Sequence, residues 1–313
     1  MRIVTLLLIL LALAYTCWFY PKVWIAIFAC MVPAFLIAMI HGERINIFSG
    51  RKLGLITAAK GNALALVGAF LVPGRVTEIL KPWYFYKTRH LPMPAGVSVL
   101  VVERIFDVIA VTGLSVVAIY FIALPPSNLD SLISNLVLVV AIVLLLVLVL
   151  TLRFPILVER LIGRLPFESV RKFIQSTFLS FRENMAYGLG YWSILLTISV
   201  WAGSVGLYWL FLQYDGGVNL DFTQSLVVFL IGTLGITITI TPGGLGTFEA
   251  AVTIILQQYG YDFEAALASA IGLRLVAFFP NAIIVSYVVL YEGIDFVRAR
   301  REAEELGAGN DNP

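Results

Sequence analysis

The 313-residue sequence has few charged residues, few histidines and few cysteines. Charged residues make up 13% of the chain, against about 25% in soluble domains. Hydrophobic residues make up 60%, which excludes an ordinary soluble protein and predicts an integral membrane protein. The net charge of +2 provides no basic field, so no nucleic-acid partner is expected. Two histidines and two cysteines do not suggest a disulfide framework, a metal site or a Ser-His-Asp triad, and no cofactor is expected.

The few cysteines and histidines suit no joint site. Cys17 and Cys30 both lie in apolar runs and are expected to be small buried hydrophobic residues. His41 and His90 lie far apart in the chain. Residues 3–19 resemble a secretory signal, but a second apolar run follows almost at once. We therefore expect a retained membrane anchor rather than a cleaved signal.

Six apolar runs are long enough, at about 20 residues, to cross a bilayer as helices. They are residues 3–19, 23–40, 96–123, 132–152, 191–213 and 264–290. Two further stretches, 53–72 and 222–240, each end at a Pro-Gly break and are followed by a shorter apolar piece, 76–88 or 247–258. Proline removes a backbone donor and glycine relaxes the dihedral angles, so each helix is expected to stop at its break.

Lysine and arginine are distributed unevenly among the connections, and this predicts the orientation of the spans. The positive connections are residues 41–52, 81–94, 153–190 and the tail, whereas 124–131 and 214–221 contain no lysine or arginine. The positive segments and both termini are therefore predicted to be cytoplasmic. Because both flanks of 53–88 are then inside, this region is predicted to be a re-entrant hairpin. The same reasoning makes 222–258 a hairpin that enters from outside, with eight full spans as the alternative.

The predicted fold is an all-α polytopic membrane protein with about six full transmembrane helices and two re-entrant helical hairpins. Residues 1–297 form a single integral membrane domain, with repeat A at about 1–124 and repeat B at about 132–297 in opposite orientation. Inverted repeats with broken helices are a recurring plan of secondary transporters. Residues 153–190 are predicted to be a cytoplasmic amphipathic connector on the anionic inner leaflet, with a solvated connector as the alternative. Residues 298–313 are expected to be a basic, then disordered cytoplasmic tail.

A polar phrase occurs twice within this apolar sequence. Pro73-Gly74-Arg75-Val76-Thr77-Glu78 is echoed by Pro242-Gly243-Gly244-Leu245-Gly246-Thr247-Phe248-Glu249, and Arg104 and Arg274 each follow about 25 residues later. An ionised residue at a helix centre costs about 2.5 to 3.5 kcal/mol, so these groups are expected to converge on one interior site. Glu103, Arg104 and Asp107 share one flank of a predicted helix, and one of the two carboxylates is expected to neutralise Arg104.

Each Pro-Gly break also offers a helix N-terminus. A helix that restarts at Thr77 or Thr247 points its free N–H groups and the positive end of its dipole at the membrane midplane. Threonine suits the N-cap position, and Gly243, Gly244 and Gly246 allow close approach of a ligand. This arrangement predicts an anion-binding geometry.

The arginines fit the same interpretation. Arg75, Arg104 and Arg274 supply charge-assisted hydrogen bonds of the kind that phosphate favours. Glu78 and Glu249 are expected to hold the arginines while the site is empty and to take up a proton when the anionic group arrives. A charge network that only joins helices is the alternative.

Four segments together resemble a known family. They are Pro73-Gly74-Arg75 with Glu78, Val102-Glu103-Arg104-Ile105-Phe106-Asp107, Thr241-Pro242-Gly243-Gly244-Leu245-Gly246-Thr247-Phe248-Glu249, and Arg274. They resemble the membrane region of lysylphosphatidylglycerol synthetases, which also occurs as stand-alone flippase-like integral membrane proteins, and the resemblance covers nearly the whole chain. It implies lipid translocation, because in two-domain members this region is linked to flipping of aminoacylated phosphatidylglycerol. The soluble aminoacyl-transferase domain is not found in this sequence, so lipid synthesis is not expected and the chain is not expected to be an enzyme.

The predicted function is a plasma-membrane lipid flippase or transporter for an anionic, phosphate-bearing lipid, such as a modified phospholipid or a polyprenyl phosphate. Membrane lipids with anionic head groups are the expected partners, a lipid-synthesising enzyme is a candidate second partner, and the oligomeric state is open. Two alternatives remain. One is a membrane-embedded lipid-modifying transferase that uses Glu78 or Glu249 as a base, and the other is a non-catalytic accessory subunit.

Overall fold

The computed structural model describes residues 14, 18–70, 75–121, 153–164, 167–188, 190–214, 217–237 and 241–293, and over these ranges it is helical without strands. The elements are α2 (Pro21–Phe48), α3 (Leu55–Ala69), η1 (Arg75–Ile79), α4 (Leu80–Arg89), α5 (Met93–Phe121), α7 (Pro155–Gly163), α8 (Glu168–Gly188), α9 (Tyr191–Tyr214), α10 (Phe222–Thr237), η2 (Pro242–Gly244), α11 (Thr247–Gln258) and α12 (Phe263–Glu292). The predictions for 132–152 and 298–313 fall outside the described residues, as does most of 3–19.

The long helices form the frame of the molecule. Within the described ranges, α2, α9 and α12 are long and apolar enough to cross a membrane. Helix α5 has 29 residues and carries three charged side chains within five positions, Glu103, Arg104 and Asp107. Helix α12 begins where the Asp262 side chain accepts a hydrogen bond from the Ala265 backbone N–H, at 2.8 Å, and ends before Gly293 in the left-handed conformation. These helices confirm the predicted all-α polytopic class.

Helix α2 continues past its predicted end. The prediction stopped at residue 40, because the polar residues that follow read as a loop, but the helix runs to Phe48. His41 and Arg44 in this last section bind carboxylates on α5, and Arg44 is fully buried. The prediction was wrong here because a charged residue can remain within a helix when its side chain is paired.

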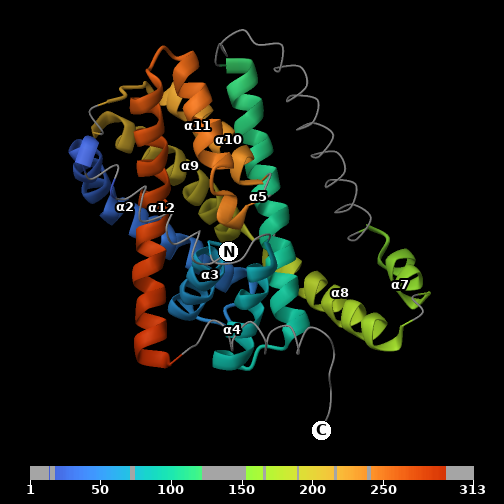
Figure 1. The fold of residues 1–313 in the computed structure, drawn as a ribbon. Coiled ribbons are helices and arrows are strands. Elements are labelled where there is room, and N and C mark those ends of the chain that lie inside the picture. Colours follow the sequence, from blue (N-terminus) through green and yellow to red (C-terminus); the bar gives the residue numbers. More distant parts are fainter. Residues whose placement is uncertain are drawn as a thin grey trace.

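Two short helices end before the Pro-Gly breaks, as predicted. Helix α3 has 15 residues and α10 has 16. At a rise of 1.5 Å per residue they measure about 22 and 24 Å, less than the hydrocarbon core of about 30 Å. We call α3, η1 and α4 hairpin A (residues 55–89) and α10, η2 and α11 hairpin B (222–258). Hairpin A lies at the lower end of the molecule and hairpin B at the upper end, both between α5 and α12 (Figure 1).

The two halves of the chain pack across each other. Helix α12 of the second half packs on α2 and α3, and α5 of the first half packs on α9 and α10. Helix α5 therefore contacts α4 of hairpin A and α10 of hairpin B. Helix α12 likewise contacts α11 of hairpin B and α3 of hairpin A. The apolar core of the described residues comprises one cluster around hairpin A, another around hairpin B, and a smaller one where α10 packs on α5 and α9. Cys30 is buried in the second cluster, as expected.

A capping box holds the start of hairpin B. The Asp221 carboxylate accepts hydrogen bonds from the Thr223 hydroxyl at 2.6 Å and from the Gln224 backbone N–H at 2.7 Å, and the Gln224 side chain accepts from the Asp221 N–H at 3.1 Å. The hydrogen bonds from Thr223 and Gln224 lower the pKa of Asp221. Helix α3 of hairpin A begins after Gly54, whose position gives no side-chain cap.

The connector between the halves is helical and amphipathic. The buried face of α8 packs on α5, with Phe181 and Met185 in the core around hairpin A. Asn184 donates a hydrogen bond to the Ser98 hydroxyl across this contact, at 2.6 Å. This face of α8 is therefore covered by protein, and contact of the connector with the inner leaflet stays a prediction.

Candidate functional site

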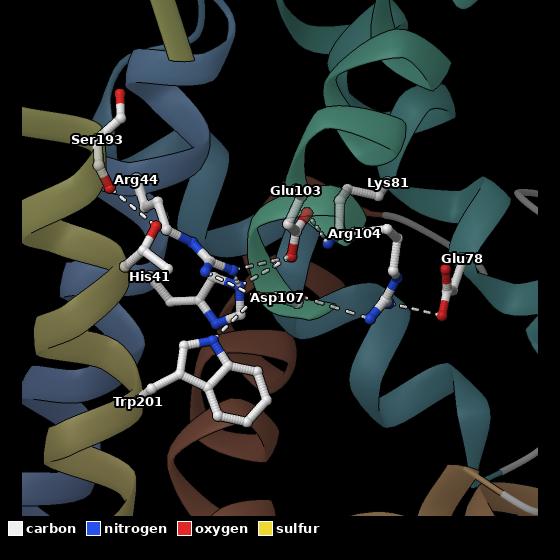
Figure 2. Close-up of polar contacts among 10 residues, drawn as sticks. His41, Arg44, Glu78, Lys81, Glu103, Arg104, Asp107, Ser193 and Trp201 are labelled. Atoms are coloured by element: carbon white, nitrogen blue, oxygen red, sulfur yellow. Dashed lines mark hydrogen bonds and ion pairs between the residues drawn. The ribbon is translucent and has the colours of Figure 1, made fainter. Parts of the chain in front are cut away.

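Glu103 on α5 is the centre of a buried charge network (Figure 2). Its side chain is 2% exposed. One carboxylate oxygen, Oε1, lies 2.8 Å from His41 Nε2 and 3.6 Å from Arg44 Nη2, and the other, Oε2, accepts a hydrogen bond from Lys81 Nζ at 2.8 Å. Three helices, α2, α4 and α5, therefore bring their polar groups to one carboxylate, which offsets the cost of burying it.

Asp107 lies one turn further along α5 and extends this network. Its Oδ1 accepts hydrogen bonds from Arg44 Nη1 at 2.7 Å and from the indole N–H of Trp201 at 3.2 Å. Its Oδ2 lies 3.6 Å from Arg104 Nη1. Asp107 thus joins the buried Arg44 to the more exposed Arg104.

Arg104 and Glu78 form the outer end of the network. Arg104 Nη2 donates to Glu78 Oε1 at 2.7 Å, and the two side chains are 41% and 22% exposed. Asp107 forms an ion pair with Arg104, as predicted for one of the two carboxylates on α5, and Glu78 from hairpin A makes a second and shorter contact. Among the described residues, the buried Arg104 Nε atom has no hydrogen-bond partner.

Hairpin B holds a second arginine in a closed setting. Arg274 on α12 donates from Nη2 to Glu249 Oε2 at 2.9 Å, and its Nε donates to the other oxygen of this carboxylate. Its Nη1 and Nη2 also donate to the carbonyls of Gly243 and Gly244, each at 2.8 Å. The guanidinium carbon lies 4.7 Å from the centre of the Phe248 ring, and the side chain is only 9% exposed.

The helix restart in hairpin B differs from the prediction. The N-cap of α11 is Gly246, with a φ of 86°, rather than Thr247. The Glu249 carboxylate accepts a hydrogen bond from the Gly246 N–H at 2.8 Å and so satisfies this helix end itself. The Thr247 hydroxyl instead donates to the Gly235 carbonyl at 2.8 Å and lies 3.1 Å from the Gly244 carbonyl. In this conformation the first turn of α11 is occupied by the chain's own carboxylate.

The restart in hairpin A also differs from the prediction, because α4 follows a 3-10 turn and its N-cap is Ile79 rather than Thr77. Thr77 lies in the 3-10 turn η1 and is buried, and its hydroxyl contacts the Ala65 carbonyl at 3.4 Å. Both threonines thus reach the carbonyl twelve residues earlier in the chain. Arg75 begins η1, and the prediction for its side chain lies outside the described residues.

The two hairpin tips meet through Phe70, at the end of α3. Its ring lies 5.6 Å from the Arg274 guanidinium carbon and 4.8 Å from the centre of the Phe278 ring. A Cβ added to Gly243 would lie 3.1 Å from the Phe70 ring, so the tips are in close contact. Among the described residues, no hydrogen bond or ion pair joins the Glu78–Arg104 pair to the Glu249–Arg274 pair, and their convergence on one ligand stays a prediction.

Four residues of this network are absent from the predicted site: His41, Arg44, Lys81 and Trp201. His41, Arg44 and Lys81 fell in segments that the charge count assigned to loops. The spacing of three between His41 and Arg44, directly after an apolar run, was a signal that the helix continues with both side chains on one face. Trp201 gave no sequence signal beyond its place in an apolar helix. Within the described ranges, no group of three or more His, Cys, Asp and Glu side chains could hold a metal ion.

Comparison with known proteins points to one family. The family described as "Lysylphosphatidylglycerol synthase TM region" matches residues 2–284. The UPF0104 membrane protein MJ1078 of Methanocaldococcus jannaschii is 23% identical over 238 residues, which are 74% of this chain and 93% of that protein. The phosphatidylglycerol lysyltransferase of Bacillus subtilis is 34% identical over 80 residues, which are 25% of this chain and 9% of that enzyme. No solved structure matches the chain.

Proposed function

Because this chain belongs to the family of the lysylphosphatidylglycerol synthase TM region, we propose that it moves an anionic, phosphate-bearing lipid between the two leaflets of the plasma membrane. The lipid head group passes through the protein at the hairpin tips while the acyl or prenyl tails stay in the bilayer. The chain acts as a translocase and leaves the lipid chemically unchanged.

One observation carries this proposal: two hairpins that begin with short helices lie at opposite ends of the frame (Figure 1), and each pairs a glutamate near its tip with an arginine of the next long helix. Non-helical backbone at membrane depth is tolerated where it lines a cavity or is buried in protein. Broken helices that meet near the midplane are the usual place for a transporter's substrate site. The similar Thr-to-carbonyl contacts in hairpins A and B support a common origin for the two halves.

The arrangement in the membrane follows from the charges. We place hairpin A on the cytoplasmic side, with both termini, because lysine and arginine gather in the segments around it. Hairpin B then enters from outside. Each hairpin tip reaches only part of the way across, so a small movement of one hairpin opens the path toward one leaflet.

Arg104 is the better phosphate ligand of the two paired arginines. Its side chain is 41% exposed and makes one short ion pair, with Glu78. Arg274 is 9% exposed and already donates to a carboxylate and two carbonyls. A lipid phosphate therefore displaces Glu78 from Arg104 at a lower cost than it displaces the partners of Arg274.

Reconstitution tests the proposal. The purified chain is placed in liposomes that carry fluorescent phosphatidylglycerol, and dithionite quenching measures how much label moves between leaflets. We expect faster movement than in empty liposomes, loss of the increase with Arg104→Ala, and retention with Arg160→Ala, an exposed arginine on α7 away from the site. Chromatography of the recovered lipid is the second readout. Movement no faster than in empty liposomes, tested also with a polyprenyl phosphate, contradicts the proposal, and a chemically altered lipid supports a transferase instead.

A further inference from the structure

While Glu103 is ionised, the contacts of His41 Nε2 with Glu103 and with Arg44 cannot both be hydrogen bonds. His41 Nε2 lies 2.8 Å from Glu103 Oε1 and 2.9 Å from Arg44 Nη2. An arginine nitrogen only donates, so a hydrogen bond from Arg44 needs an Nε2 atom without a proton. A hydrogen bond between Nε2 and Glu103 then needs the proton on the carboxyl group. If Nε2 carries the proton instead, it donates to Glu103 and faces the Arg44 donor.

The surrounding network is electrically balanced while His41 is neutral. It contains three cations and three carboxylates among the described residues: Arg44, Lys81 and Arg104, and Glu78, Glu103 and Asp107. One added proton therefore leaves one uncompensated positive charge in a mostly buried site. Such a charge is costly unless an anion arrives with it.

The charges that face the His41–Glu103 pair come from three helices. Arg44 extends from α2, Lys81 from α4, and Asp107 from α5, with Arg104 beside Glu103 on the same helix. Helix α9 contributes the neutral indole of Trp201 through Asp107, and its sequence contains no charged side chain and no histidine.

The other helices that pack on α2 also carry charged residues that form separate ion pairs. These pairs are Lys60–Glu292 between α3 and α12, Lys52–Glu183 at α8, and Arg274–Glu249 at α12. On α2 itself, Glu43 accepts a hydrogen bond from Asn46. The pair is thus coupled to the network described above rather than to these groups.

A chain of contacts connects the pair to the proposed phosphate ligand. Arg44 lies between Glu103 and Asp107, and Asp107 lies between Arg44 and Arg104. A proton on the His41–Glu103 pair weakens the hold of Glu103 on Arg44, and Arg44 then draws Asp107 away from Arg104. His41 is the accessible member of the pair, at 22% exposed against 2% for Glu103.

We propose that His41 and Glu103 form a proton-binding site, and that the proton is a co-substrate that enters with the anionic lipid head group. This inference rests on the proposed lipid translocation. One proton from water binds the pair, the charge of the network rises by one, and the lipid phosphate at Arg104 restores the balance. Both leave together on the other side of the membrane, and the empty network returns to neutrality. No bond other than the N–H or O–H bond forms or breaks.

The proton site is tested directly by infrared spectroscopy. The full chain in vesicles is titrated between about pH 5 and about pH 8, the range in which histidine ordinarily changes charge. We expect a pH-dependent imidazole or carboxyl band in the wild type that is lost in Glu103→Gln and in His41→Gln. The matched control is His90→Asn, since His90 is exposed and lies outside the network. If both network variants retain every titrating band of the wild type, the inference is wrong.

Lipid movement gives the second measurement. We expect fluorescent phosphatidylglycerol to move about tenfold faster into the leaflet opposite an acidic compartment than with equal pH on both sides, a typical size for coupling between two ligands. His41→Gln removes this dependence and His90→Asn keeps it. The wild-type comparison needs no variant, so misfolding of a variant does not decide the result.

Movement that is equal with and without the gradient overturns the proton coupling and leaves the proposed function intact. Absence of movement under every condition contradicts the proposed function, while the infrared titration still decides whether the proton site exists.

Discussion

Hairpins A and B share one plan and differ in how they hold their arginine. In both, a threonine after the break reaches a carbonyl twelve residues earlier, and a glutamate pairs with an arginine of the next long helix. In hairpin B the glutamate also caps its own helix, and the arginine is enclosed by carbonyls and aromatic rings. In hairpin A the arginine is partly exposed and continues into a buried network.

This difference assigns separate roles to the two halves. An arginine with four hydrogen bonds to groups of its own chain stabilises a fixed geometry, as Arg274 does. An arginine with one short ion pair and an unpartnered Nε among the described residues is available to a ligand, as Arg104 is. We therefore interpret hairpin B as the more rigid half of the site and hairpin A as the half that responds to substrate and protons.

Arg274→Ala is the strongest way to break this comparison. It removes the guanidinium that pairs with the mostly buried Glu249 carboxylate and binds two carbonyls, and we expect a loss of about 3 to 5 kcal/mol in the free energy of unfolding. Denaturant titration of the purified chain, followed by tryptophan fluorescence, measures this loss. Arg160→Ala is the matched control and should unfold like the wild type. An Arg274→Ala chain as stable as this control would show that hairpin B does not depend on its arginine.

Gly235→Ala tests the close packing inside hairpin B. A Cβ at this position would lie 2.8 Å from the Thr247 carbonyl oxygen and 2.9 Å from the Ala251 Cβ. We expect a loss of about 1 to 3 kcal/mol in the free energy of unfolding. Gly206→Ala on α9 is the control, since an added Cβ there meets nothing within 4 Å. At the corresponding position hairpin A has Ala65, and its threonine contact is longer. If Gly235→Ala is as stable as the Gly206→Ala control, hairpin B is not packed more closely than hairpin A at this position.

Asp221→Ala tests the capping box at the start of hairpin B. Hairpin A has no such capping box, because the N-cap of α3 is Gly54. We expect a loss of about 1 kcal/mol at neutral pH. Because the pKa of Asp221 is lowered in the folded state, its contribution is complete above the pKa of the unfolded chain and is lost as the pH falls through the folded value. Hydrogen exchange of the first turn of α10 follows this change, with the first turn of α3 as the internal reference. A mutational effect that persists in strong acid would contradict the carboxylate as its source.

Arg104→Ala has the smallest expected effect on folding. Its ion pair with Glu78 is partly exposed, so the free energy of unfolding should change by less than about 1 kcal/mol. Lipid translocation is nevertheless expected to fall to the level of empty liposomes, because the proposed phosphate ligand is removed. The same two measurements are made on Arg274→Ala, for which we expect the larger loss in the free energy of unfolding. If Arg104→Ala unfolds as readily as Arg274→Ala, the two arginines do not have separate roles.

Much of the fold could be predicted because a bilayer restricts the choices. Apolar runs gave the positions of α5, α9 and α12, and the two Pro-Gly phrases marked the ends of α3 and α10. The same phrases located Glu78, Arg104, Glu249 and Arg274. Charge counting was less reliable near the helix ends, since it treated His41, Arg44 and Lys81 as loop residues. A charged residue beside an apolar run has the same sequence signal whether it faces water or a buried partner.

The sequence by itself determined that this chain is a helical membrane protein with two broken helices, because length, apolarity and Pro-Gly breaks act locally along the chain. Only the tertiary structure decided which charges meet. Glu103 binds groups from α2 and α4 that lie 62 and 22 residues away, and Arg104 prefers Glu78 over its neighbours on the same helix. Ion pairing depends on distances between helices, and these are set by the packing of all of them at once.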